Sequence, residues 1–249
     1  MPRQPRKQSR SGFMHIITRG VGRQIIFEER FDYIYYLRKL KKYSEETGIE
    51  VHAYCLMSNH VHLLICDRVN GLPLFMKKMG ISYTAYYNKK YDRVGHLFQG
   101  RYLSEVIEDE AYYFTVLRYI MNNPVKAGIC AAKDFEWSSF SEYYGEKNPI
   151  VKTKIIRDAM GSKTNFELFL SEANVQEDRK NNQSSCNGSV DSKNEVLVKR
   201  LLGVKSGTEL QSYGKEKRNA ALKLLKSKGI TVREIERITG INRGVVQRA

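Results

Sequence analysis

Apolar residues along the chain follow two kinds of pattern, short runs rich in β-branched residues and longer segments with helical spacing. Short apolar runs bounded by turn residues predict strands, and apolar positions three or four residues apart predict amphipathic helices. In chain order, the patterns predict a strand at 11–19, a helix at about 28–46, extended segments at 50–57 and 60–67, a helix at about 72–90, a strand ending at 106 and a helix at 109–122. This order favours an α+β domain in which helices cover an antiparallel sheet of the ferredoxin-like type.

Turn and capping residues mark the predicted ends of these elements. Gly48 closes the first helix, and Pro124 stops the helix at 109–122. The region 50–67 is either one continuous strand or two strands broken at Ser58-Asn59, and the sequence leaves both possibilities open. The residues predicted on the apolar side of the first helix are Phe31, Ile34, Tyr35 and Leu40.

The C-terminal residues predict a second, smaller module made only of helices. A helix at 215–228 is followed by Thr231 and Glu234, which form a capping box that opens a short helix. Asn242 then caps a final helix that begins at Arg243. The core positions predicted in the first of these helices are Ala220, Leu222 and Leu225. The pattern indicates a helix-turn-helix, and the alternative is a small helical bundle that packs on another protein.

Composition sets the predicted boundaries between these parts. From Asn174 to Asn194 the chain holds almost no apolar residue, which is typical of a solvated linker. We therefore expect a basic N-terminal arm at 1–10, a main α+β domain at 11–150, a helical extension at 151–173, a polar linker at 174–194 and a helix-turn-helix-like domain at 195–249.

The charge of the chain indicates a polyanionic partner. The net charge is +15 with a pI of about 9.6, and residues 193–249 alone carry 14 Lys and Arg against 5 Glu, a net of +9. No apolar run is long enough to span a membrane, and the basic start leads into no signal-like segment. The four cysteines are widely spaced without a Cys-x-x-Cys pair, so we expect a protein of the reducing cytoplasm, associated with the nucleoid.

A His60-Val61-His62 triplet is the first candidate for chemistry. In a strand through this region, Ser58, His60 and His62 share one face, and an apolar set shares the other. That apolar set is predicted to be Cys55, Met57, Val61, Leu63 and Ile65. Burying two imidazoles costs free energy unless they are paired or ligated, so the triplet is either a hydrogen-bonded structural pair or half of a metal site.

The helix at 109–122 supplies the complementary candidates. Tyr119 and Asn123 are four residues apart and lie one above the other on a helical face. Asn123 offers a carbonyl oxygen as a third metal ligand, and Tyr119 offers a phenol that a nearby divalent cation makes nucleophilic. The residues alone do not single out Tyr119, because Tyr102, Tyr112 or Tyr113 could fill the same role.

Four blocks of sequence together resemble the IS200-type single-tyrosine transposases of the HUH class, in particular the branch associated with repetitive extragenic palindromes. The blocks appear in the order and spacing of that family, and the resemblance covers about residues 11–145. They are Met57-Ser-Asn-His-Val-His-Leu-Leu64, His96-Leu-Phe-Gln-Gly-Arg101, Arg118-Tyr-Ile-Met-Asn-Asn-Pro-Val-Lys-Ala-Gly128 and Trp137-Ser-Ser-Phe-Ser-Glu-Tyr143.

The resemblance implies the roles of the candidate residues. It implies that His60 and His62 bind Mg²⁺ or Mn²⁺ and that Tyr119 is the nucleophile, which nicks single-stranded hairpin or palindromic DNA and forms a 5′-phosphotyrosine that another strand resolves. Asn123 stands where insertion-sequence members of the family carry Gln, which leaves the third ligand in doubt. No nucleotide cofactor is expected, because the chain lacks a Gly-x-x-x-x-Gly-Lys-Ser/Thr phosphate loop.

Basic and polar residues around these blocks are the predicted DNA contacts. Near the candidate site these are Arg19, Arg23, Gln99, Arg101 and Lys126, and in the C-terminal module they are Arg233, Asn242, Arg243 and Gln247. Each could instead be a solvated surface charge. Trp137 stacks an unpaired base or packs in the core, and His96 is structural or contacts a phosphate. His15 either lies near the site or is a packed histidine, and we expect the packed histidine.

Two other functions compete with a DNA-nicking and strand-transfer enzyme. One is a domesticated, non-catalytic DNA-binding regulator in which the C-terminal helix-turn-helix acts alone. The other is a metal hydrolase of small phosphate esters, which accounts for the histidines but not for the net charge of +15. The sequence is compatible with a monomer or a homodimer.

Overall fold

The computed structural model describes residues 9–145, 149–172, 193–204 and 207–249. The chain divides into two compact units, Met1–Phe166 and Glu167–Ala249, which are described separately. Residues 1–8 of the predicted basic arm and 174–192 of the predicted linker lie outside the described residues.

The first unit is built on a four-stranded antiparallel sheet. Its strands are β1 (Phe13–Arg19), β2 (Glu50–Met57), β3 (His60–Cys66) and β4 (Leu103–Ile107), in the order β2-β3-β1-β4. Helix α1 (Arg30–Thr47) connects β1 to β2, and α2 (Leu72–Lys90) connects β3 to β4. The chain order and the sheet order are those of the ferredoxin-like fold, so the predicted fold class is confirmed.

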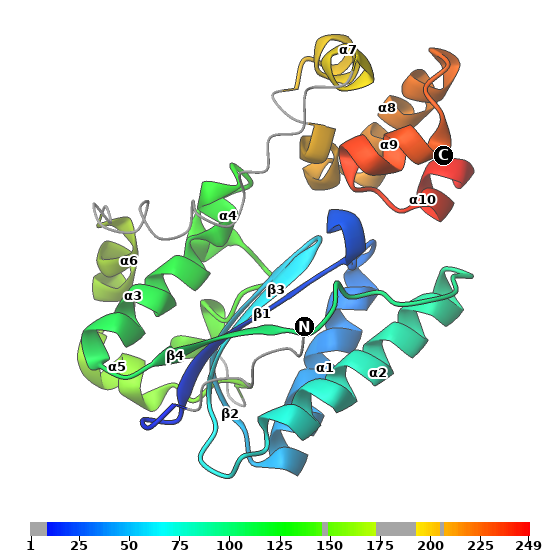
Figure 1. Cartoon of the computed structure of the whole chain (residues 1–249). Coiled ribbons are helices and arrows are strands. Elements are labelled where there is room, and N and C mark those ends of the chain that lie inside the picture. The colour runs from blue at the N-terminus through cyan, green and yellow to red at the C-terminus, as the bar shows by residue number, and fades with distance from the viewer. Residues whose placement is uncertain (1–8, 146–148, 173–192, 205–206) are drawn as a thin grey trace. The chain divides into compact units, whose positions relative to one another are not determined.

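Helices cover both faces of this sheet. Helices α1 and α2 lie side by side on one face, and α3 (Glu110–Met121) lies on the other, as Figure 1 shows. The shorter elements of the unit are 3₁₀ turns at Val21–Arg23, Ala132–Asp134 and Ser141–Tyr143 and helices α4 (Asn123–Lys126), α5 (Lys154–Met160) and α6 (Lys163–Ser171). The open edge of β2 is covered, because Leu56 N donates to Trp137 O and Ser139 N donates to Tyr54 O.

A tight turn at Ser58-Asn59 separates β2 from β3, which settles the question that the sequence left open. In the resulting register Met57 pairs with His60 and Cys55 pairs with His62. Directly paired residues share a face, so Cys55 and Met57 lie on the histidine face and not on the opposite one as predicted. A break in the strand resets the alternation that a continuous strand would have kept.

Helix α1 follows its predicted span, but one of its apolar positions was misassigned. Phe31 is 70% exposed, and Tyr36, which is 1% exposed, packs in the core instead. Phe31 is the second residue of the helix, at its N-terminal edge, where the sheet does not reach it. Gly48 ends the helix with φ of 70°, a left-handed conformation that glycine adopts without strain.

A buried carboxylate joins the start of α1 to the end of α2. Asp32 is fully buried and belongs to a capping box with Glu29. Its carboxylate accepts hydrogen bonds from Glu28 N, Glu29 N, the hydroxyls of Tyr86 and Tyr91, and Lys90 Nζ at 2.6 Å. A buried charge with this many donors is compensated, so it stabilises the helix pair that supports the sheet.

The second unit is helical throughout its described residues. It contains α7 (Lys193–Leu202), a 3₁₀ segment at Gly207–Ser212, α8 (Lys215–Ser227), α9 (Val232–Thr239) and α10 (Arg243–Arg248). The predicted capping box of Thr231 and Glu234 is present, and Asn242 caps α10 by accepting from Gly244 N at 2.8 Å. One predicted core position is wrong, because Ala220 is exposed while its neighbour Ala221 is buried.

Among the helices that the structure describes, none is both long and apolar enough to cross a membrane.

We predict that Asp32→Asn lowers the free energy of unfolding by about 3–5 kcal/mol, because Lys90 and several buried donors lose their charged partner. Urea unfolding followed by circular dichroism measures the loss. The matched control is Asp92→Asn, which changes an exposed residue at φ of 47°, a conformation that asparagine tolerates, by less than about 0.5 kcal/mol. A loss below about 1 kcal/mol at Asp32 would show that the cluster contributes little.

A second prediction concerns acid stability and His52, which is 2% exposed and shares a hydrogen bond of 3.1 Å with the Tyr113 hydroxyl. Burial lowers the pKa of His52 to about 4 despite the opposing carboxylate of Glu50. Below about pH 6.5 the unfolded chain therefore binds a proton that the folded state does not, and stability falls as the pH drops toward 4.

In the variant His52→Phe, the slope of the free energy of unfolding against pH should be smaller by up to about 1.4 kcal/mol per pH unit, which corresponds to one proton. Denaturant unfolding between pH 7 and 4 gives the slope. His96→Gln, at an exposed position, should keep the wild-type slope. An unchanged slope in His52→Phe would mean that His52 does not control acid stability.

Candidate active site

The two histidines of the triplet begin β3 and lie on the sheet face that α3 covers. His62 is 2% exposed, and its ring centroid lies 4.9 Å from that of His60. Arg19, at the end of β1, pairs in register with His60. The turn before β3 thus places both imidazoles under a helix at one end of the sheet.

Tyr119 of α3 lies against these imidazoles. Its ring is edge-on to His62, with centroids 5.4 Å apart, and to His15, with centroids 5.8 Å apart. The ammonium of Lys126 lies 4.6 Å from the centroid of the Tyr119 ring. This is the geometry of a cation–π contact.

The other three tyrosines considered from the sequence lie elsewhere. Tyr113 hydrogen-bonds to His52, and the Tyr112 hydroxyl donates to Glu105. Tyr102 lines a cavity on the opposite face of the sheet. Of the four candidates, Tyr119 therefore has the contacts with the histidine pair.

Asn123 connects the tyrosine to the histidines. It is 9% exposed, its Nδ2 donates to Tyr119 O at 2.9 Å, and its side chain also hydrogen-bonds to His60. The spacing of four residues survives although α3 ends at Met121, because α4 begins at Asn123. The amide is thus held between the backbone of the tyrosine and one imidazole.

Both imidazoles are kept neutral by their surroundings. Burial first, and then the positive charge of Arg19, lower the pKa of His60 to about 4, against the opposing effect of the hydrogen bond to Asn123. Burial, and then the neighbouring His60, His15 and Arg19, hold the pKa of His62 well below its ordinary value of 6.5. Neutral imidazoles present the lone pairs that a metal ion requires.

The Nδ1 atoms of both His60 and His62 already have hydrogen-bond partners. His60 Nδ1 lies 2.6 Å from Asn59 Oδ1, and His62 Nδ1 lies 2.9 Å from His15 Nε2. At His62 the nitrogen left for a ligand is therefore Nε2. At His60 the second nitrogen is the one available to the Asn123 side chain, which hydrogen-bonds to that ring. Within the described residues no group of three His, Cys, Asp or Glu side chains is arranged to hold a metal. Beside the two imidazoles, the Asn123 amide is the candidate third ligand. Two neutral imidazoles and an amide fit a divalent ion.

The sequence left His15 either near the site or packed and favoured the packed histidine, whereas the structure places it in contact with His62. The register of β1 against β3 creates this contact, since Ile17 pairs with His62 and His15 with Leu64. Alternation along β1 alone indicates that His15, Ile17 and Arg19 share a face. Only the pairing shows that this face is the one with the triplet.

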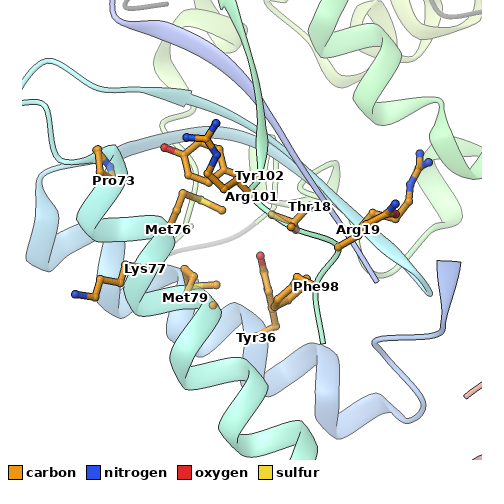
Figure 2. A pocket seen from close by; sticks show the side chains of 13 residues that line it. Thr18, Arg19, Tyr36, Pro73, Met76, Lys77, Met79, Phe98, Arg101 and Tyr102 are labelled. Atoms are coloured by element: carbon orange, nitrogen blue, oxygen red, sulfur yellow. The ribbon is translucent and has the colours of Figure 1, made fainter. Parts of the chain in front are cut away.

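A cavity of about 290 Å³ opens on the opposite face of the sheet, between α2, the end of β1 and residues 98–102. Figure 2 shows Met76 and Met79 of α2 and Tyr36 of α1 among its walls. The predicted DNA contacts Arg19, Gln99 and Arg101 also line it.

An irregularity in the edge strand creates this space. Ile17 pairs with Leu103, but Gly20 bridges to Phe98, so the edge segment has extra residues around Gly100, which has φ of 63°. The extra residues bulge away from Thr18, which also lines the cavity.

The remaining predicted contacts have varied surroundings. Arg23 is exposed, with its carbonyl accepting from Asn59 Nδ2, and Lys126 lies beside Tyr119 as described. In the second unit Arg233, Arg243 and Gln247 are exposed, whereas Asn242 is 6% exposed and its side chain caps α10.

Trp137 and His96 differ from each other in their surroundings. Trp137 is half-buried and stacks on Tyr33 at 4.3 Å, and Arg30 lies 5.3 Å from its ring centroid. His96 is exposed.

The comparison with family models agrees with the motifs. The family model described as "Transposase IS200 like" matches residues 9–123. No protein of curated function matches the chain. One similar solved structure is a REP-associated tyrosine transposase bound to a REP hairpin, 18% identical, covering 61% of this chain and 91% of that chain with a TM-score of 0.47. Another is a putative transposase from Deinococcus radiodurans R1, 18% identical, covering 49% of this chain and 97% of that chain with a TM-score of 0.35.

Proposed function

We propose that this chain, whose residues 9–123 belong to the IS200-like transposase family, is a metal-dependent single-stranded DNA endonuclease and strand transferase with Tyr119 as its nucleophile. The observation that carries the proposal is the position of Tyr119 edge-on to His62, 5.4 Å between ring centroids, with Asn123 bonded to both Tyr119 and His60. A phenol, two neutral imidazoles and an amide oxygen converge at one point.

His60 and His62, with the Asn123 oxygen, would hold Mg²⁺ or Mn²⁺. When bound, such an ion supplies polarisation of a non-bridging phosphate oxygen and favours the phenolate. Imidazole ligands favour Mn²⁺ by affinity, and cellular abundance favours Mg²⁺. Two residues of the chain act beside the ion. Lys126 stabilises the phenolate of Tyr119, and Asn123 fixes the backbone of Tyr119.

The proposed reaction is a transesterification at phosphorus. Tyr119 loses its phenolic proton to solvent, and its oxygen forms a bond to the phosphorus of the scissile phosphodiester. The bond from phosphorus to the 3′-oxygen breaks, and the departing oxygen takes up a proton. The 5′-phosphotyrosine keeps one phosphoester for another, so the 3′-hydroxyl of a second strand reverses the step and joins the strands without a nucleotide cofactor.

Two surfaces are suited to bind the DNA. The cavity beside Arg101 combines a cation for a phosphate with the sulfur and aromatic walls of Met76, Met79 and Tyr36, which suits unpaired nucleotides beside a hairpin. In the second unit, exposed Arg233, Arg243 and Gln247 on α9 and α10 are suited to a duplex. Asn242 acts there by fixing the start of α10.

Tyr119→Phe is predicted to abolish a covalent protein–DNA adduct that the wild-type protein forms. The measurement incubates the full chain with a labelled oligonucleotide, a hairpin with single-stranded flanks, and Mn²⁺, followed by denaturing electrophoresis. The matched control is Tyr113→Phe, six residues earlier on the same helix, whose hydroxyl bonds to His52 and not to the histidine pair. This variant should still form the adduct. An adduct that persists in Tyr119→Phe would assign the nucleophile to another residue, and no adduct from wild-type protein with any hairpin would favour the non-catalytic regulator.

Arg233→Ala combined with Arg243→Ala is predicted to weaken hairpin binding and to reduce the slope of log Kd against log salt by about 1–2, because each phosphate contact releases about one counterion. Fluorescence anisotropy at several salt concentrations measures both quantities, and the Mn²⁺ affinity should not change. The matched control is Lys223→Ala with Lys226→Ala on α8, which removes the same charge. Equal effects of the two pairs would show that binding senses net charge and not a surface on α9 and α10.

A further inference from the structure

We infer that His15 is a positioning residue, which fixes the tautomer and orientation of His62 and thereby directs the lone pair of His62 Nε2 into the candidate metal site. The inference rests on the metal site of the proposed function and adds a residue that the metal-ligand set does not include. It also adds Glu105, on the opposite edge strand, as the group that orients His15.

The bond between the two imidazoles is short and buried. His15 Nε2 lies 2.9 Å from His62 Nδ1, and the two side chains are 4% and 2% exposed. Their rings are stacked, with centroids 5.1 Å apart and planes 22° apart. Water cannot replace this hydrogen bond at a site so enclosed, so losing it leaves a buried polar atom unpaired.

A hydrogen bond between two ring nitrogens of neutral imidazoles contains one proton, which belongs to one ring or the other. If His62 Nδ1 carries the proton, His62 Nε2 has a lone pair and can bind a metal. If His15 Nε2 carries it, His62 Nδ1 accepts, His62 Nε2 carries a proton and the metal cannot bind there. The tautomer of His15 therefore decides whether His62 is a ligand.

Glu105 selects the productive arrangement. Its Oε2 lies 3.9 Å from His15 Nδ1, and its Oε1 is held by the Tyr112 hydroxyl. A carboxylate attracts an N–H and repels a lone pair, so it favours the proton on His15 Nδ1 and leaves His15 Nε2 as the acceptor. The sequence of contacts from Tyr112 through Glu105 and His15 to His62 crosses from α3 to β4, β1 and β3.

The two histidines of the triplet are thus oriented in different ways. His60 Nδ1 has the oxygen of its neighbour Asn59 as partner, and that oxygen can only accept. His62 depends on a residue 47 positions away in the sequence, whose ring can donate or accept. Orientation of the buried histidine is therefore the more easily lost.

The test compares His15→Phe and His15→Gln in the full chain. Phenylalanine keeps a flat ring against His62 and Tyr119 but offers no acceptor, whereas the glutamine amide oxygen can accept the His62 proton from a similar position. Imidazole ¹⁵N correlation spectra of the metal-free proteins report which nitrogen of His62 carries the proton. Calorimetric titration with Mn²⁺ reports the affinity, and thermal unfolding verifies that each variant is folded.

We expect wild-type His62 to carry its proton on Nδ1, and His15→Phe to lose that preference and bind Mn²⁺ about 10–100-fold more weakly. His15→Gln should bind within about threefold of wild type. Glu105→Gln, which places a possible donor beside His15, should raise the share of the opposite His62 tautomer. His96→Gln, at an exposed histidine, should change nothing.

Two results would overturn the inference: a folded His15→Phe that binds Mn²⁺ like wild type, or a wild-type His62 that carries its proton on Nε2. Failure of the proposed metal site is a separate result, because wild-type protein would then not bind Mn²⁺ at all. In that case the ¹⁵N spectra of wild type and His15→Phe still decide whether His15 sets the tautomer of His62.

Discussion

Burial of His60 and His62 beneath one helix is the constraint on which the rest of the site depends. Removing an imidazole from water penalises its protonated form, which keeps the pair neutral, and it also makes every unmet hydrogen bond expensive. Asn59, His15 and Asn123 meet those needs. The burial that keeps both imidazoles neutral therefore also fixes the orientation of each ring.

The two faces of the sheet in the first unit carry different features. The α3 face has the histidines and the tyrosine, while the opposite face, under α1 and α2, has the cavity of about 290 Å³. Arg19 belongs to both regions, because it pairs in register with His60 and also lines the cavity. The candidate active site and the cavity therefore meet at the end of one strand.

Local patterns predicted most of the secondary structure, because the signals involved are local. The bounds of α2 coincide with the predicted helix, and the Thr231–Glu234 capping box and the αL glycine at Gly48 form as expected. The errors arise where tertiary placement decides burial. Phe31 has helical spacing but lies at the start of α1. Ala220 and Ala221 are neighbours on α8, and only the side of the helix on which each one lies makes the first exposed and the second buried.

Of the site, the sequence predicted the residues whose roles a motif carries, and it missed those that depend on pairing between distant strands. His15 became a partner of His62 through the β1–β3 register, and the cavity arose from a mismatch between β1 and the edge segment around Gly100. Neither feature has a local signature. The resemblance of the motifs already named Tyr119, whereas helical spacing alone left Tyr102, Tyr112 and Tyr113 open. The contacts of Tyr119 with the histidine pair agree with the motif.

The tight connection at Ser58-Asn59 has a consequence for how this protein can vary. Because side chains in a strand alternate between faces, a shift of β3 by one residue against its neighbours, caused by a residue added or deleted before His60, would turn both imidazoles toward α1 and α2. A substitution in the hairpin changes the local packing by a small amount, but an insertion or deletion moves both imidazoles to the other face of the sheet. Natural variation in this hairpin should therefore proceed by replacement of residues while their number stays constant.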